Sequence, residues 1–278
     1  MPNSRAAKRG RKIYIAVDFE GAACVIGTPG KPTEGLGTGL DCNTAVFKQA
    51  QRLVTAETNA AIRGALAAGA TEIIVEDNHG CGHNLLYEEL HPEAKVIMGT
   101  PRPKRFAVLD DSFDGLILLC HHAMAGARKG ILAHSYSSQQ VHRMILNGRP
   151  IGEIGCDAAI AGERGVPVIF VSSDDIGCKE AQTFLGRDLI TVATKQGLGQ
   201  HCALSLSPLK AQALTEEGVE RAVKTLNTRK PYRIKSPYVM DHVYKWEAQA
   251  DAAARAEGAQ RLDAYRVRRV GKSLEALL

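Results

Sequence analysis

The sequence predicts an α/β protein, in which a mainly parallel sheet carries helices on both faces and a smaller mixed α+β part follows. Three observations support this fold class. Short apolar runs alternate with segments of helical periodicity through most of the 278 residues. These runs are continuous rather than alternately polar, which indicates strands that are buried on both faces. After residue 206 the regular alternation ends.

The expected elements have recognisable limits. The first strand carries β-branched side chains at Ile13, Ile15 and Val17. A helix over residues 41–68 follows, with Asp41 as its N-cap. It is expected to stop at Gly69. Further strands are expected at residues 72–77, 94–99, 115–120, 166–174 and 189–194, and a further helix at residues 153–163.

Other segments depart from the strand–helix alternation. Asn147-Gly148 is a strong two-residue turn signal between strand-like flanks, so residues 141–153 are expected to contain a hairpin. A capped amphipathic helix begins with Pro208 at its first position, and the chain ends in a short helix over residues 272–278. The expected organisation is a flexible basic tail at 1–11, an α/β metal-binding domain at 12–205 and a C-terminal α+β region at 206–278.

Composition excludes several classes of protein. The hydrophobic share of 45% and charged share of 23% are those of a globular domain. The net charge of +5 lies largely in the first twelve residues, where no aromatic side chain accompanies it, so no nucleic-acid partner is expected. No apolar run approaches the roughly 20 residues of a membrane span, and no signal peptide is expected. Seven scattered cysteines without Cys-x-x-Cys spacing favour a reducing cytoplasm.

Acidic and imidazole side chains follow the predicted strands where they end. Asp18 and Glu20 lie two positions apart after the first strand, so they face the same side of an extended backbone. Two like charges so placed repel each other unless a cation lies between them. The alternative is that one carboxylate caps the following turn and the other is solvated. His79 follows the second strand, and His121 and His122 follow the fourth.

Two more candidates come later in the chain. His134 lies in "ILAHSYS", and Glu153 begins the helix after the hairpin. Because ligands of open parallel sheets bind beyond the carboxyl ends of the strands, we expect these side chains to converge. Histidine and carboxylate ligands without cysteine suit Zn²⁺ or a similar divalent ion. The set exceeds the three protein ligands of one catalytic zinc, so two metals that share a bridging carboxylate would use all of it.

For several other polar residues the sequence leaves two interpretations open. The side chains of His121 and His122 diverge on an extended backbone, so only one of them is expected to reach a metal. Asp175 either caps the following helix or contacts substrate. Lys195 either binds an anion or is solvated.

The motifs "AVDFEG", "VEDNHG", "HHAMAG", "AHSYS", "NGRPIGEIG" and "TKQG", in this order, resemble the zinc D-aminopeptidase family over residues 12–205. This resemblance implies a two-zinc hydrolase that removes N-terminal D-amino acids from short peptides and forms a homo-oligomeric ring. It also implies His134 as the catalytic histidine and Asp18 as the natural bridge. The metal ligands that it implies are Asp18, Glu20, His79, His122 and Glu153.

The mechanism expected from this resemblance is hydrolysis by a zinc-activated water, whose pKa falls toward about 7. His134 would stabilise the oxyanion or move a proton to the leaving nitrogen. A dinuclear amidase acting on another small amide or a peptidoglycan fragment is an alternative. A phosphoesterase is another, although the sequence shows no Arg clamp and no Gly-rich phosphate loop. A metabolite-binding module without enzymatic activity is a third.

Overall fold

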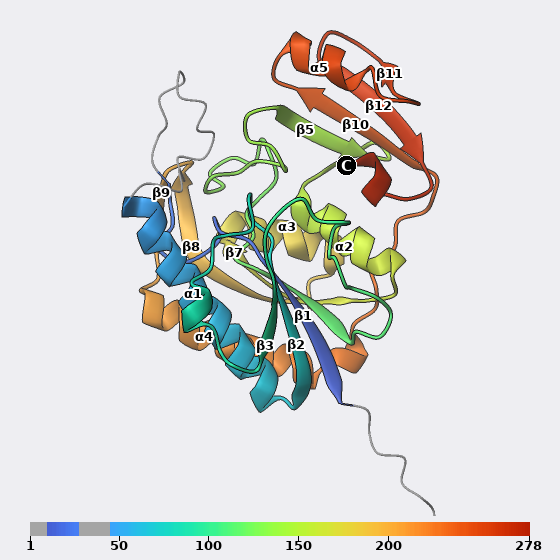
Figure 1. Ribbon diagram of the computed structural model, residues 1–278. Coiled ribbons are helices and arrows are strands. Elements are labelled where there is room, and N and C mark those ends of the chain that lie inside the picture. The colour runs from blue at the N-terminus through green and yellow to red at the C-terminus, as the bar shows by residue number, and fades with distance from the viewer. Residues whose placement is uncertain (1–9, 28–44) are drawn as a thin grey trace, which may run out of the picture.

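The computed structural model describes residues 10–27 and 45–278, which form two sheets with helices around the larger one (Figure 1). Most of the predicted basic tail, and Asp41 as the predicted N-cap, lie outside the described residues. In the part of the chain that is described, no helix has the length and apolar character needed to cross a membrane.

The larger sheet is parallel except for its last strand, which confirms the predicted fold class. Its strand order is β3-β2-β1-β4-β7-β8-β9, and only β9 runs antiparallel to its neighbour. Every strand expected from the apolar runs is present, whereas β9 was not predicted. The strands are β1 (Arg11–Val17), β2 (Ala70–Asp77), β3 (Ala94–Ile97), β4 (Gly115–Leu119), β7 (Val168–Asp174), β8 (Ile190–Gly199) and β9 (Cys202–Ser205).

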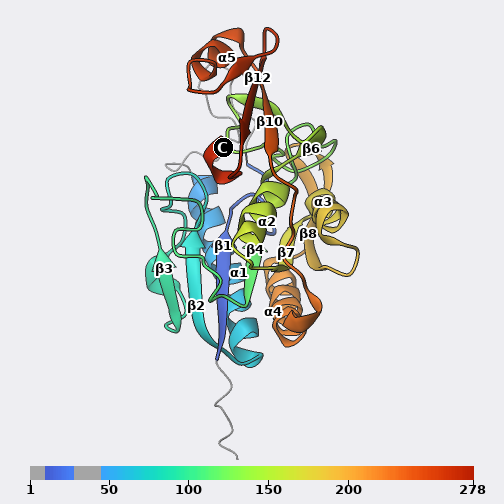
Figure 2. The same cartoon turned by 90° about the vertical axis from the view of Figure 1, so that its right-hand side faces the viewer.

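Helices cover both faces of this sheet (Figures 1 and 2). Side chains of β1 alternate between two cores, so that Ile13 and Ile15 pack on one face and Tyr14 packs on the other. The first core contains residues of α1 and α4, and the second contains residues of α2 and α3. The helices are α1 (Ala45–Ala67), α2 (Glu153–Glu163), α3 (Asp175–Leu185) and α4 (Pro208–Lys224).

Helix termini agree with the sequence in part. At the end of α1, Gly69 takes a φ of +86°, a conformation that suits glycine. At the start of α3, the side chain of Asp174 accepts a hydrogen bond from the Gly177 amide at 2.7 Å. Asp174 is therefore the cap that was expected at Asp175. The expected terminal helix is reduced to the 3-10 turn η4 (Glu275–Leu277).

A second, antiparallel sheet lies above the larger one in Figure 1 and has the order β11-β12-β10-β5-β6. The predicted hairpin is present, with φ of +49° at Asn147 and +81° at Gly148. The hairpin pairs with strands from the end of the chain, whereas α4 packs beside α1. The division into domains stays a prediction. The elements here are β5 (Val141–Leu146), β6 (Arg149–Ile151), β10 (Tyr238–Tyr244), α5 (Glu247–Ala253), β11 (Gln260–Arg261) and β12 (Arg266–Gly271).

The strand order places a switch point between β1 and β4. The chain proceeds from β1 outward to β2 and β3, then returns to the other side of β1 with β4. The loops that follow β1 and β4 therefore leave the sheet in different directions, which opens a crevice at the carboxyl ends of the strands. The candidate residues after β1, β2 and β4 therefore lie close to this switch point. They are Asp18, Glu20, His79, His121 and His122.

Candidate metal centre

Main-chain hydrogen bonds join the loop after β1 to the loop after β4. The Asp18 amide donates to the Leu119 carbonyl at 2.9 Å, and the Gly21 amide donates to the Cys120 carbonyl at 2.7 Å. A Cβ at Gly21 would lie 2.1 Å from the His121 carbonyl oxygen, so only glycine fits between the two loops. This close approach brings the acids of one loop to the histidines of the other.

The six candidate residues meet in one place. His122 Nε2 lies 3.1 Å from Glu153 Oε1 and 3.4 Å from Asp18 Oδ2. His79 Nε2 lies 3.2 Å from Glu20 Oε1. Within the described residues, three sets have ligand atoms within 4.8 Å of one another: Asp18 with His122 and Glu153, Asp18 with Glu20 and His79, and Glu20 with His122 and His134.

The orientation of His122 indicates a cation beside it. Its Nδ1 lies 3.0 Å from the Ala123 carbonyl oxygen, which can only accept. Nδ1 therefore carries the proton, and Nε2 of the neutral ring presents a lone pair to Glu153 and Asp18. Lone pairs that face carboxylate oxygens at these distances repel one another unless a proton or a metal ion lies between them.

His79 is held in the same manner. The Asn84 side-chain amide donates to Asp77 Oδ1 at 2.6 Å and to the His79 carbonyl, so Asn84 Oδ1 is an acceptor. His79 Nδ1 lies 3.1 Å from this oxygen and donates to it, which directs the Nε2 lone pair at Glu20. The ring also stacks on Phe19, with centroids 5.0 Å apart. A fixed imidazole whose second nitrogen is hydrogen bonded is typical of metal ligands.

Two carboxylate oxygens at the centre lack a donor. Asp18 Oδ2 and Glu20 Oε2 are buried, and no residue of the described ranges donates a hydrogen bond to them. Asp18 is 6% exposed and Glu20 is fully buried. A buried charge without a partner is costly, and a divalent ion removes that cost. The donor set of carboxylates and imidazoles therefore fits zinc.

The pKa shifts of the clustered side chains indicate that the cluster has an excess of negative charge. Burial, with the charge of Glu20, raises the pKa of Asp18 to about 7. Burial lowers the pKa of His79, but Glu20 outweighs burial and raises it to about 10. Burial likewise opposes the rise at His122, where Glu153 holds the pKa well above its ordinary value. Without a metal ion, protonation of both Nε2 atoms would balance two carboxylates, and Asp18 would remain without a counter-charge.

His134 lies beside this cluster in a different state. Its Nδ1 is 2.8 Å from the Leu132 carbonyl oxygen, so Nδ1 donates and Nε2 is the free acceptor. Nε2 lies 3.9 Å from both Glu20 Oε1 and Glu153 Oε1. Burial and the charge of His122 lower the pKa of His134, which keeps its ring neutral near pH 7. A neutral imidazole of this orientation can accept a proton.

A cavity of about 300 Å³ opens onto the cluster. Its lining also includes residues that the sequence did not mark as candidates, among them Arg102, Arg105 and Tyr136. The guanidinium of Arg105 pairs with Asp157 at 2.7 and 2.9 Å and lies 3.8 Å from Glu153 Oε2. No Arg clamp was expected from the sequence, and the arginine that the structure places here is largely engaged by Asp157. Asp157 follows Glu153 by four positions on α2, a spacing that the sequence displays.

Burial excludes both interpretations of Lys195, and distances separate the two adjacent histidines. Lys195 is 2% exposed, and its Nζ donates to the carbonyls of Glu20 and Ala22 at 2.6 Å and to that of Val25, so it is neither solvated nor free for an anion. Of the two adjacent histidines, only His122 reaches the cluster. His121 Nε2 instead lies 3.5 Å from Asp157 Oδ2.

The fold and this cluster point to one class, an α/β enzyme with a candidate metal site at the switch point of the sheet. A family model described as Peptidase M55, D-aminopeptidase, matches residues 11–278. The chain is 35% identical over 221 residues to a D-aminopeptidase of Bacillus subtilis (strain 168), which covers 79% of this chain and 76% of that protein.

A solved structure agrees with the family match. It is described as the Zn-dependent D-aminopeptidase DppA from Bacillus subtilis, a self-compartmentalizing protease. The two chains have a TM-score of 0.87 and 31% identity, over 95% of this chain and 93% of that one. This chain therefore belongs to the M55 family of D-aminopeptidases and is a metal-dependent aminopeptidase. The resemblance seen in the sequence motifs is confirmed.

Proposed function

We propose that this protein releases N-terminal D-amino acids from short peptides or amides with the help of two zinc ions. The proposed ligands are Asp18, Glu20, His79, His122 and Glu153. The observation that carries this proposal is the convergence of two imidazole Nε2 atoms on three buried carboxylates. The two ligand sets that do not include His134 share Asp18, which supports its role as the bridge.

Zinc, when bound, supplies a Lewis acid and lowers the pKa of a water toward about 7. The chain's own residues then orient and protonate the reactants. Glu153 begins α2, so the helix dipole favours its negative charge. Its Oε1 also accepts the Tyr136 amide at 2.7 Å, which holds the carboxylate toward His122.

His134 is proposed to carry the proton. Its neutral ring presents Nε2 to the cavity, so it accepts a proton from the attacking water and delivers it to the leaving nitrogen. Such a group contributes roughly 10²–10⁴-fold to the rate.

A phosphoesterase is the second candidate, because Arg102 and Arg105 line the cavity. Both guanidiniums are largely engaged, Arg105 by Asp157 and Arg102 by Glu76 at 3.2 Å. An amide substrate therefore fits the site better than a phosphate ester does.

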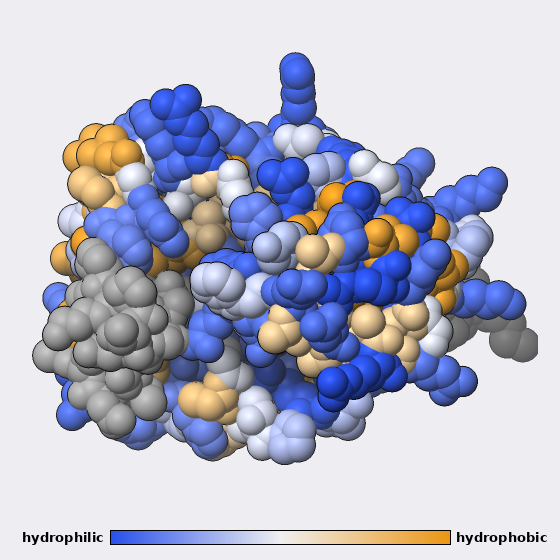
Figure 3. All heavy atoms as spheres, turned by 90° about the horizontal axis from the view of Figure 1, so that it is seen from above, coloured by the Kyte–Doolittle hydropathy of each residue, from blue (hydrophilic) through white to orange (hydrophobic). Residues whose placement is uncertain are grey.

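Self-association and a cytoplasmic location are also proposed. The solved relative is described as self-compartmentalizing, and Leu198, Leu204 and Leu209 expose 52%, 65% and 77% of their surface here. Figure 3 shows one face of the molecule on which hydrophobic patches interrupt a mainly hydrophilic surface. Light scattering coupled to gel filtration tests the assembly: a monomer at micromolar concentration would contradict it.

Six free cysteines in the described ranges agree with a reducing compartment.

A panel of paired D- and L-aminoacyl amides, assayed with zinc and again with a chelator, tests the reaction. We expect hydrolysis of the D-amides, loss of activity with the chelator and recovery with Zn²⁺. Nitrophenyl phosphate serves as the competing substrate. Faster turnover of the phosphate ester, or equal turnover with the chelator, would contradict the proposal.

A further inference from the structure

A buried ion pair, Arg105 with Asp157, lies beside the metal centre and is not among the proposed metal ligands. Arg105 Nε donates to Asp157 Oδ1 at 2.9 Å, and Arg105 Nη2 donates to Asp157 Oδ2 at 2.7 Å. Asp157 is fully buried, and the Arg105 side chain is 18% exposed. Two parallel hydrogen bonds between a guanidinium and a carboxylate are strong and directional. The pair is therefore a fixed part of the wall of the site.

The same guanidinium lies close to a proposed metal ligand. Arg105 Nη2 is 3.8 Å from Glu153 Oε2. This distance is too long for a hydrogen bond, although a shift of about 1 Å would bring the two atoms within range. Glu153 and Asp157 are one helical turn apart on α2, so both carboxylates face Arg105. One guanidinium thus has two carboxylates within reach and is bonded to only one of them.

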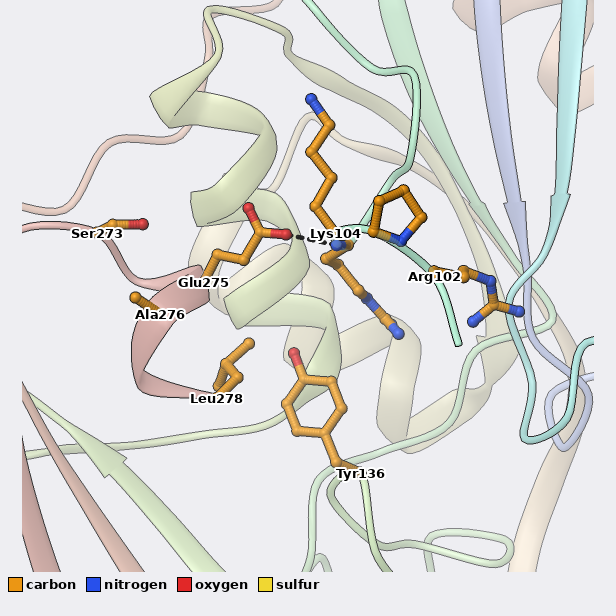
Figure 4. A pocket seen from close by; sticks show the side chains of 9 residues that line it. Arg102, Lys104, Tyr136, Ser273, Glu275, Ala276 and Leu278 are labelled. Carbon is orange, nitrogen blue, oxygen red and sulfur yellow. Dashed lines mark hydrogen bonds between the residues drawn. The ribbon is translucent and has the colours of Figure 1, made fainter. Parts of the chain in front are cut away.

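Neighbouring contacts hold this arrangement. The Tyr136 hydroxyl donates to Asp157 Oδ1 at 3.3 Å, and its ring centroid lies 5.3 Å from the guanidinium carbon of Arg105. The Tyr136 amide donates to Glu153 Oε1 at 2.7 Å, so the main chain engages one oxygen of Glu153 while Arg105 approaches the other. The Arg105 amide donates to Glu275, which lies with Tyr136 on the wall of a neighbouring cavity (Figure 4). Arg105 is therefore held at its main chain and at its guanidinium.

A cation that pairs with a metal ligand competes with the metal ion for it. If Arg105 were hydrogen bonded to Glu153, a divalent ion would have to break a charge-assisted pair before it could bind this carboxylate. Asp157 removes the competition, because it supplies Arg105 with a full counter-charge and two acceptor oxygens. Residues that orient metal ligands from behind typically change metal affinity by about 10–100-fold when they are replaced.

We propose that Asp157 is a positioning residue of the metal centre: by holding Arg105, it keeps the guanidinium from pairing with Glu153 and leaves this carboxylate available to zinc. The inference rests on the proposed two-zinc function and deepens it, because it names a residue that sets the metal affinity of the site. Arg105 without Asp157 then weakens metal binding, whereas loss of both charges is nearly neutral. A pair that only stabilised the fold would not give this order.

Zinc dissociation constants, measured by competition with a chromophoric chelator, test the proposal. In Asp157→Asn the side chain keeps its shape and loses its charge, so Arg105 is free to turn to Glu153. We expect the zinc affinity of this variant to fall about 10-fold or more. The double variant Arg105→Gln, Asp157→Asn replaces the ion pair by two neutral amides, and its zinc affinity should lie within about twofold of that of the native chain.

A second buried acid supplies the matched control. Asp241 is 1% exposed and pairs with Arg266 and Arg268 in the second sheet, at 2.9 and 2.6 Å. Asp241→Asn therefore removes the same charge from the same kind of pair and should leave zinc affinity unchanged. Urea unfolding in the presence of chelator checks that each variant folds.

The outcomes separate this proposal from the proposed function. Equal zinc affinity in the native chain and Asp157→Asn, or an equal loss in Asp157→Asn and either the double variant or Asp241→Asn, would overturn the positioning role while the aminopeptidase proposal stands. If Asp157→Asn does not fold, the double variant decides: native affinity supports the role, and a loss of about 10-fold overturns it. A native chain that binds no zinc, or that binds zinc and leaves D-alanyl amide intact, would overturn the proposed function itself.

Discussion

The substitution Asp18→Asn should distinguish two effects of the Asp18 carboxylate: it lowers the unfolding free energy of the metal-free protein, and it is proposed to bind zinc. In the metal-free protein, burial and Glu20 raise the pKa of Asp18 from an ordinary 3.8 to about 7. The folded state then holds a proton that the unfolded state releases, so stability falls as pH rises from about 4 to about 7. One pH unit corresponds to about 1.4 kcal/mol, and the interval to about 4 kcal/mol.

Asparagine has the same shape but does not ionise. With chelator present, the unfolding free energy of the native chain should fall between pH 5 and pH 8 by about 2–3 kcal/mol more than that of Asp18→Asn. The reason is that about two pH units of the interval from pH 4 to pH 7 lie in this range. With zinc present, we expect the native chain to have the higher unfolding free energy. The variant lacks the proposed bridging carboxylate and should bind fewer than two ions.

Urea unfolding at both pH values, with and without chelator, measures these free energies, and elemental analysis counts the zinc. Asp111→Asn removes an exposed acid and is the control, for which the pH dependence should match the native chain. The reasoning would be refuted by parallel pH profiles for native and Asp18→Asn proteins without metal, or by full zinc content in the variant.

Three further substitutions test parts of the site. His134→Ala should lower kcat roughly 10²–10⁴-fold with zinc content unchanged, and loss of zinc would show that the residue is a ligand instead. Lys195→Met leaves three buried carbonyls without a donor and should cost about 3 kcal/mol or more in urea unfolding, whereas Lys179→Met at the surface should cost less than about 1 kcal/mol. Gly21→Ala should lower both the melting temperature and zinc retention, while Gly199→Ala, which meets open space, should change neither; equal effects would contradict the close-approach argument.

The larger sheet could be predicted because its strands are buried on both faces and are therefore uninterrupted apolar runs. The predicted hairpin apart, the strands of the second sheet could not, because they contain many charged side chains. Asp241 lies in the middle of β10 and pairs with Arg266 and Arg268 of β12. Each charged side chain on its own argues against a strand, and only the paired arrangement makes the strand stable. β9 is a four-residue edge strand and gives too short a pattern to detect.

The residues at the strand ends could be predicted because topology alone brings the ends of parallel strands together. The arginines could not, since Arg102 and Arg105 lie on an irregular loop whose path the sequence does not specify. A partial signal did exist at Asp157, which lies one helical turn after Glu153 and so faces the same way. Lys195 was open between solvation and anion binding because its burial depends on the loop after β1, which packs over it.

The position of Lys195 explains why it does not supply the counter-charge that Asp18 lacks. This lysine is close enough to reach the main chain of Glu20, yet its ammonium is committed to the carbonyls of Glu20, Ala22 and Val25 rather than to a carboxylate. It fixes the loop without neutralising it, even though burial lowers its pKa to about 8. Glu57 holds the same loop, because its Oε1 accepts a hydrogen bond from the Ala23 amide at 2.7 Å. A loop that is held by its backbone leaves the carboxylate oxygens available to the proposed metal ions, and the repulsion that remains would favour the binding of divalent cations.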